Sequence, residues 1–128
     1  MAFALSWMGQ VALSVSSADR AEAFYGDQLG LRKLFRFGGL IFFDCGVRLM
    51  LEQTREGEKV PPGSPLYFKV ADIKLARREL EGRGVAFIDD IHLVSPMEDH
   101  DLWMTFFKDP DGNLLALMSE TPKGYKPV

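Results

Sequence analysis

The order of predicted strands and helices occurs twice along the 128-residue chain, and this repeat constrains the fold more than any other feature. Residues 10–52 predict a strand, a helix and then three strands, and the second half of the chain predicts the same order. When Val15 is superimposed on Val70, Tyr25 falls on Leu80, so the spacing within the two halves also agrees. We therefore predict an internal duplication of a βαβββ unit.

Local signals mark the start of each helix. The first helix is predicted within residues 16–30, where Ser16 or Ser17 can cap the first turn and a glycine can end the last one. Asp72 can cap the second helix, "IKLARRELEGRG", which is also followed by glycine. In both segments apolar residues recur at helical spacing, so each helix is expected to bury one face.

Turn signals separate the predicted strands at "GG" (38–39), "CG" (45–46) and "DPDGN" (109–113). In the second half, "VAFI" (85–88) predicts a short strand and "DDIHLVSPMEDHD" (89–101) predicts a long irregular loop. The charged, proline-rich segment 54–65 predicts a connector between the two halves, because it contains no regular periodicity.

Composition excludes several classes of partner. The net charge is −3, which disfavours nucleic acid and anionic membranes, and no stretch reaches the ~18–20 apolar residues of a membrane span. The apolar start "MAFALSWMGQ" lacks the basic region and cleavage site of a signal peptide. The single cysteine, Cys45, cannot form an internal disulfide and is expected to be a half-buried apolar side chain, so we expect a cytoplasmic protein.

Two motifs carry a resemblance to a known family: "VSSADRAEAFYGDQLGL" after the first strand and "KDPDGN" in the last hairpin. From Gln10 to Glu120 the chain resembles the vicinal oxygen chelate superfamily, which includes glyoxalase I, extradiol dioxygenases, fosfomycin-modifying enzymes and bleomycin-resistance proteins. The resemblance implies an α+β fold. Two βαβββ units, about residues 8–53 and 66–120, would form a curled mixed sheet around a cavity, with the helices on the outer face. We expect one domain over residues 1–128, with a tail at 121–128.

Strand alternation then predicts which side chains face the cavity. Leu13, Leu49, Phe68 and Leu117 belong to the apolar sets that should pack against the helices. The side chains on the opposite faces are the candidate ligand-binding residues: Gln10, Ser14, Arg48, Met50, Glu52, Tyr67, Lys69, Ala116 and Met118.

The resemblance also implies where a metal ion would be held. Members similar to glyoxalase I use four side chains, from the first and fourth strands of each unit, and these positions fall on Gln10, Met50, Pro65 and Ala116. Only the glutamine offers an oxygen ligand, whereas a metal site needs at least three protein ligands. We therefore expect no metal and no other cofactor, although a register shift of two residues would bring in Glu52.

Other arrangements remain open. His92 and His100 could form an iron site with a neighbouring carboxylate, but a polar loop at the rim is the simpler interpretation. The inward charges could form an Arg48–Glu52 or a Lys69–Glu52 pair, or could contact a polar group of a ligand.

The sequence therefore supports two functions. The first is a protein that binds a small aromatic or amphipathic molecule without transforming it, as in members similar to bleomycin-resistance proteins. The second is an enzyme of the same superfamily, a lyase, isomerase or dioxygenase, with an atypical metal centre or none. Because curled half-sheets leave open edges, we also expect a homodimer, with residues 54–65 as its hinge.

Overall fold

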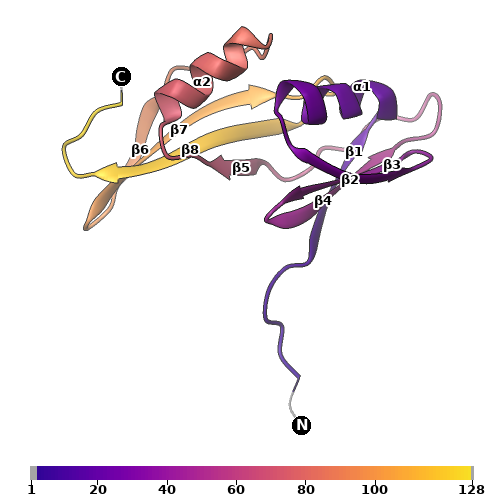
Figure 1. Ribbon diagram of the computed structural model, residues 1–128, viewed down its shortest axis with the longest axis horizontal. Coiled ribbons are helices and arrows are strands. Elements are labelled where there is room, and N and C mark those ends of the chain that lie inside the picture. Colours follow the sequence, from indigo (N-terminus) through magenta and orange to yellow (C-terminus); the bar gives the residue numbers. More distant parts are fainter. Residues whose placement is uncertain (1–2, 128) are drawn as a thin grey trace. The chain divides into compact units, whose positions relative to one another are not determined.

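The computed structural model describes residues 3–127 and divides into two units between Gly63 and Ser64, within the predicted connector. Unit 1 contains β1 (Gln10–Val15), α1 (Ala18–Glu22), η1 (Ala23–Gln28), β2 (Arg32–Phe37), β3 (Leu40–Cys45) and β4 (Val47–Gln53). Its sheet has the order β1-β4-β3-β2. β1 and β4 run parallel, and the other two pairs are antiparallel (Figure 1).

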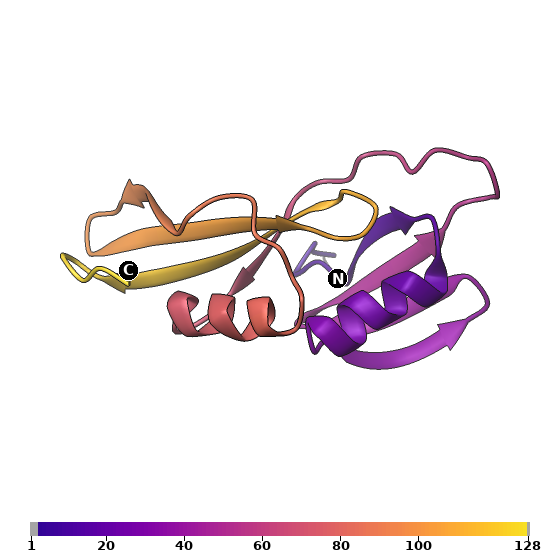
Figure 2. The same ribbon diagram turned by 90° about the horizontal axis from the view of Figure 1, so that it is seen from above.

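Unit 2 repeats this topology, so the α+β fold with two βαβββ units is present as predicted. It contains β5 (Leu66–Lys69), α2 (Ile73–Gly82), β6 (His92–Pro96), β7 (His100–Lys108) and β8 (Leu114–Pro122). Its sheet has the order β5-β8-β7-β6, with β5 and β8 parallel. Residues 54–65 contain no helix or strand, and Figure 2 shows them as a long loop.

The first helix begins where its cap predicts. Ser17 has an extended backbone, and its side chain accepts a hydrogen bond from Arg20 N at 3.2 Å. After Glu22 the helix widens into the π-helix η1, a change that the periodicity did not predict. A charged side chain from β2 ties α1 to the sheet: Arg36 contacts Asp19 and Glu22 of this helix at 2.7 and 2.8 Å.

The second helix is also capped as predicted, with Asp72 accepting from Leu75 N at 3.0 Å. Gly84 follows its end with a φ of 88°, a conformation that glycine adopts without steric cost. Figures 1 and 2 both show α2 lying on one face of the unit 2 sheet.

The segment after α2 differs from the prediction. Residues 85–88 form no strand, and their only pairing with a strand is a single bridge between Phe87 and Phe107. The predicted loop 89–101 instead contains β6, which pairs with β7 through a bulge between Leu93 and Ser95. The reason is a side chain: the carboxylate of Asp89 accepts from Phe106 N at 2.8 Å, which takes the place of a backbone ladder bond before β6 begins.

The core of each unit lies between its helix and one face of its sheet. In unit 1 the buried face consists of Leu13, Val15, Ile41, Phe43, Leu49 and Leu51, packed against Ala18, Ala21, Phe24 and Tyr25 of the helix. The corresponding face of unit 2 mixes apolar residues, such as Phe107 and Leu115, with buried polar ones. These polar groups are bonded; for example, Trp103 Nε1 donates to Thr121 Oγ1 at 3.0 Å.

The last hairpin turns through the "DPDGN" motif, as predicted. Asp109 is buried, and its Oδ1 accepts hydrogen bonds from Asp111 N at 2.9 Å and Asn113 N at 2.8 Å. Its Oδ2 accepts from Asn113 Nδ2 at 2.8 Å. Gly112 has a φ of 86°, which the turn requires.

Across the residues that the structure describes, no helix is long and apolar enough to span a membrane.

We predict that Asp109→Ala lowers the free energy of unfolding by about 1–3 kcal/mol, because it leaves buried N–H donors without an acceptor. Urea denaturation would show this as a lower midpoint with an unchanged slope. Asp27→Ala, at an exposed position, is the matched control and should change the midpoint little. Equal midpoints for the two variants would contradict the role of the turn carboxylate.

Candidate ligand-binding faces

Five of the predicted site residues lie together on the open face of the unit 1 sheet. In β1 and β4 the alternate residues Leu13, Val15, Leu49 and Leu51 are buried against the helix. The intervening positions, which are partly or fully exposed, therefore point to the other side. They are Gln10 and Ser14 on β1, and Arg48, Met50 and Glu52 on β4. The parallel register places Gln10 beside Arg48 and Ser14 beside Glu52.

Three of these side chains, Gln10, Arg48 and Met50, form an ordered stack with the rings of Phe42 and Phe35. Arg48 Nε donates to Gln10 Oε1 at 2.8 Å, and Gln10 Nε2 lies 3.7 Å from Met50 Sδ. The Arg48 guanidinium carbon lies 5.2 Å from the centroid of the Phe42 ring, a cation–π distance. Phe42 in turn stacks on Phe35, with centroids 4.4 Å apart. The open face of unit 1 thus presents flat aromatic surface beside a cation and an amide.

The open face of unit 2 carries the other four predicted residues. Tyr67 and Lys69 lie on β5, and Ala116 and Met118 lie beside them on β8. Ala116 has no exposed surface, and its partners in register are Tyr67 on one side and Phe106 on the other. The two rings are 6.0 Å apart in an edge-to-face arrangement. An approaching molecule would therefore meet the rings before it met Ala116.

A chain of charges crosses the same face. Lys69 Nζ lies 3.0 Å from Glu120 Oε1, and His100 Nε2 lies 2.8 Å from Glu120 Oε2. The other ring nitrogen of His100 lies 2.6 Å from Asp99 Oδ1. The hydrogen bond from Lys69 lowers the pKa of Glu120, and that from His100 lowers the pKa of Asp99. Lys69 is therefore paired with Glu120 of its own unit, and Arg48 is bonded to Gln10, so each of these cations has a partner other than Glu52.

Both histidines belong to strands rather than to a loop, so that interpretation of residues 89–101 was wrong. His92 begins β6, and its ring stacks on Phe106 at a centroid distance of 6.2 Å. Its Nδ1 lies 2.8 Å from the backbone oxygen of Asp90. His100 begins β7. Sequence analysis missed Glu120. It left open which aromatic residues of 42–43 and 103–107 face the site, because the "FF" repeats at 42–43 and 106–107 hide which ring faces which side; the contacts of Phe42 and Phe106 place these two rings on the open faces.

The residues at the four family metal positions do not fit a metal ion. The side-chain oxygen of Gln10 is already bonded to Arg48, and Ala116 has no donor atom. Met50 offers only a thioether, and Pro65 precedes β5 and has no side-chain donor. Within residues 3–127, no three His, Cys, Asp or Glu side chains gather closely enough to hold a metal.

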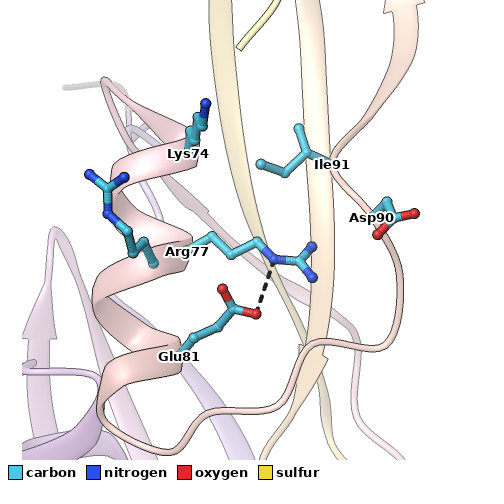
Figure 3. A pocket seen from close by; sticks show the side chains of 6 residues that line it. Lys74, Arg77, Glu81, Asp90 and Ile91 are labelled. Atoms are coloured by element: carbon cyan, nitrogen blue, oxygen red, sulfur yellow. Dashed lines mark ion pairs between the residues drawn. The ribbon is translucent and has the colours of Figure 1, made fainter. Parts of the chain in front are cut away.

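Each unit also has a hollow of moderate size. The one in unit 1, about 570 Å³, lies where the sheet meets the connector and is lined by Ser14, Leu40, Glu52, Arg55, Glu58 and Pro61 among others. Two of these, Ser14 and Glu52, are predicted site residues. The one in unit 2, about 630 Å³, lies between α2 and residues 90–91 (Figure 3). It contains none of the predicted residues.

Arg77 has a structural role at the unit 2 hollow. Figure 3 shows its side chain reaching from α2 toward Ile91 and Asp90, with its ion pair to Glu81 at 3.6 Å. Its guanidinium also donates to Asp89 O at 2.6 Å and to Thr105 Oγ1 at 2.8 Å. These bonds tie the helix to the segment that leads into β6.

Cys45 behaves as the sequence predicts. It is half-buried, and its thiol lies 3.3 Å from the backbone oxygen of Val47. Burial raises its pKa, and the neighbouring Asp44 adds to the effect. Since the thiolate is the reactive form, this environment makes the thiol a poor nucleophile.

The chain contains two βαβββ units, and each has a sheet face that no helix covers. A fold of this kind can serve binding proteins as well as enzymes. The chain belongs to the Glyoxalase/Bleomycin resistance protein/Dioxygenase superfamily, whose sequence model matches residues 7–117. The comparison with curated proteins gave no match.

Solved structures agree with this assignment of the fold. A glyoxalase/bleomycin resistance protein/dioxygenase from Nocardioides is 18% identical, with a TM-score of 0.75 over 99% of this chain and 91% of that one. A superfamily member from Sphaerobacter thermophilus is 24% identical, with a TM-score of 0.73 over 91% and 98%. Lactoylglutathione lyase from Agrobacterium tumefaciens is 23% identical, with a TM-score of 0.69 over 89% and 93%. At these identities the likeness shows the fold.

We predict that Lys69→Met raises the pKa of Glu120, because it removes the hydrogen bond that favours the ionised carboxylate. A carboxyl group with a lowered pKa stabilises the fold above its ordinary pKa, and this contribution is lost as the pH falls through the folded-state value. The stability difference between wild type and variant should therefore shrink on acidification. NMR titration of the Glu120 carboxyl carbon measures the shift, and Lys74→Met is the control that should leave it unchanged.

Proposed function

We propose that this chain binds a small aromatic or amphipathic molecule on the open sheet faces, without a metal ion. The observation that carries the proposal is the stack of Phe35, Phe42 and Arg48 with its bonded Gln10. Rings and a cation held on an open face offer both apolar area and a directed contact, which is the combination that small-molecule sites use.

The unit 2 face supports the same kind of guest. Tyr67 is 48% exposed although it belongs to a strand, and its ring borders that of Phe106. Lys69 and His100 share Glu120, so the face also offers polar groups fixed in position by their partners. Met50 and Met118, which lie on the two faces, have flexible thioethers that adapt to the shape of a ligand.

Charge favours a ligand that carries an anionic group. Arg48 is stacked and bonded to a neutral amide rather than to a carboxylate, so its positive charge is not neutralised by that contact. A carboxylate on an aromatic ring could contact the guanidinium while the ring stacks on Phe35, which is 48% exposed. We place the protein in the cytoplasm on the sequence argument above.

An enzymatic role is the second candidate, and one observation favours testing it. His100 lies between the carboxylates of Asp99 and Glu120 on the open face of unit 2, and histidine is the side chain that most often moves protons near neutral pH. One of the solved structures with this fold is a lactoylglutathione lyase, so the fold is compatible with an enzyme.

We expect the protein, expressed with Zn, Ni, Mn and Fe in the medium, to retain far less than one metal ion per chain after gel filtration, because only Gln10 among the four positions is a donor. Elemental analysis checks this. About one retained ion per chain would contradict the metal-free proposal and would direct attention to Glu52 and the strand histidines.

We expect an aromatic carboxylate at about 100 times its dissociation constant to add roughly 2.7 kcal/mol to the free energy of unfolding. Arg48→Met should weaken that binding about ten- to hundredfold, because a hydrogen bond to a charged group contributes about 1.5–3 kcal/mol. Arg78→Met, at an exposed position on α2, is the matched control. A thermal-shift screen of varied aromatic acids that finds no ligand, or equal losses in the two variants, would count against the proposal.

A further inference from the structure

The two histidines on the open face of unit 2 differ in what their ring nitrogens contact. Both nitrogens of His100 face carboxylates, since Nε2 lies 2.8 Å from Glu120 Oε2 and Nδ1 lies 2.6 Å from Asp99 Oδ1. The Nδ1 atom of His92 lies 2.8 Å from the backbone oxygen of Asp90, whereas its Nε2 atom has no hydrogen-bond partner within residues 3–127. Nε2 of His92 is therefore the histidine nitrogen that this face leaves for a ligand.

The contact at Nδ1 decides where the ring of His92 carries its proton. A backbone carbonyl only accepts hydrogen bonds, so the nitrogen that contacts the Asp90 oxygen must be the donor. The carboxylate of Asp89, 3.6 Å from the same nitrogen, favours the same arrangement. In a neutral imidazole the second nitrogen is then unprotonated, so Nε2 presents a hydrogen-bond acceptor.

Asp89, which lies beside this ring, is itself held in place. Its Oδ1 accepts hydrogen bonds from Phe106 N at 2.8 Å and from Thr105 Oγ1 at 3.0 Å. Its backbone oxygen accepts from Arg77 at 2.6 Å, and Figure 3 shows this arginine reaching from α2 toward the segment. His92 is therefore oriented by groups that the fold of unit 2 fixes, although β6 is an edge strand.

The ring of His92 belongs to a row of three rings. It stacks on Phe106 with an interplanar angle of 20°, and Phe106 meets Tyr67 edge to face. The side chain of His92 is 44% exposed, and Tyr67 at the other end of the row is 48% exposed. The acceptor nitrogen thus lies at one end of an exposed aromatic surface on which a flat molecule can stack.

The register of the strands places apolar surface beside this acceptor. Met104 is the partner of His92, Met118 is the partner of Met104, and Lys69 is the partner of Met118. Lys69 therefore lies three strand spacings from His92, about 14 Å along the sheet, and it is paired with Glu120. A small ring bonded to His92 would lie over thioether and aromatic surface, away from the charge of Lys69.

The charges around His92 favour a donor over an anion. Asp89 and Asp90 both lie next to the ring and are acidic, so an anionic group of a ligand would be repelled there. Arg77 approaches Asp89 from α2, and its charge is offset by Glu81 at 3.6 Å. The polar group that suits this position is an N–H or an O–H.

We infer that Nε2 of His92 accepts a hydrogen bond from an aromatic ligand, so that unit 2 selects flat molecules that carry a phenolic O–H or a ring N–H. This contact differs from the one proposed for unit 1, where Arg48 favours an anionic group. The inference rests on the proposed function, because it names the polar group by which unit 2 recognises the aromatic molecule.

Pairs of compounds that differ only in the donor test this contact. The probes are β-naphthol with its methyl ether, and indole with N-methylindole, each titrated into the full chain and followed by NMR. We expect wild type to bind the donor of each pair about two- to tenfold more tightly, the ratio that one net hydrogen bond gives. The nitrogen signal of His92 Nε2 should shift with the donor and not with its methylated partner.

His92→Phe removes the acceptor and keeps a flat ring beside Phe106. We expect the affinity ratio within each pair to fall to about one, while the methylated compounds bind as they do to wild type, because they have no hydrogen bond to lose. His100→Phe, at the other histidine of the same face, is the matched control and should keep the ratio. Tyr67→Phe, which removes the hydroxyl at the far end of the row, should keep it too.

The tautomer can be measured without a ligand. The chain has two histidines, so long-range nitrogen–proton NMR spectra at about pH 8, where histidine is ordinarily neutral, contain two imidazole rings. Comparison with His92→Phe assigns them. We expect the His92 ring to carry its proton on Nδ1 and none on Nε2.

Four results would overturn the inference and leave the proposed function standing: a His92 ring protonated at Nε2, a ratio of about one in wild type, a ratio that survives His92→Phe, or a ratio that is lost in Tyr67→Phe. Failure of all the probes to bind wild type would overturn the inference and count against the proposed function as well. The two failures are therefore distinguished by whether the methylated compounds bind.

Discussion

In each unit a helix of modest length covers one face of a four-stranded sheet, and the burial of that face fixes the register of every strand. A slip of one residue in β4 would turn Leu49 and Leu51 to solvent and bring Arg48 and Glu52 into the core. Each fully buried leucine contributes about 1.5–3 kcal/mol, and a buried unpaired charge costs more than that. The buried apolar side chains on the covered faces therefore also fix the open faces, and with them the position of every candidate site residue.

This constraint explains why much of the fold was predictable from sequence. Strand alternation, the Ser17 and Asp72 caps and the "DPDGN" turn are local signals, and each acts within a few residues of where it is read. Because the same order of strands and helix occurs twice along the chain, these local signals together predicted the topology of both units. The faces of β1, β4 and β5 followed from alternation, because one side of each strand is more apolar than the other.

The errors arise where a distant contact decides the local structure. The position of β6 depends on Asp89 accepting from Phe106 N and on Arg77 bonding Asp89 from α2, and neither contact is visible in the sequence around residues 85–101. The polar residues of that segment predicted a loop, although an edge strand can be just as polar. The partners of Lys69 and Arg48 were open for the same reason, because pairing with Glu120 or Gln10 depends on strand neighbours far along the chain.

The two units share one topology but present different chemistry. The open face of unit 1 is a neutral stack of rings with one guanidinium bonded to an amide, whereas that of unit 2 joins rings to a chain of paired charges through Glu120. At the positions where the resemblance would put metal ligands, Met50 and Ala116 supply a thioether and a methyl group. A metal ion dictates the geometry of its guest through fixed bond directions, whereas stacking constrains mainly the plane of a ring. A face built on stacking therefore selects flat molecules by shape and leaves the choice among them to a few polar contacts, of which Arg48 is the best placed on unit 1.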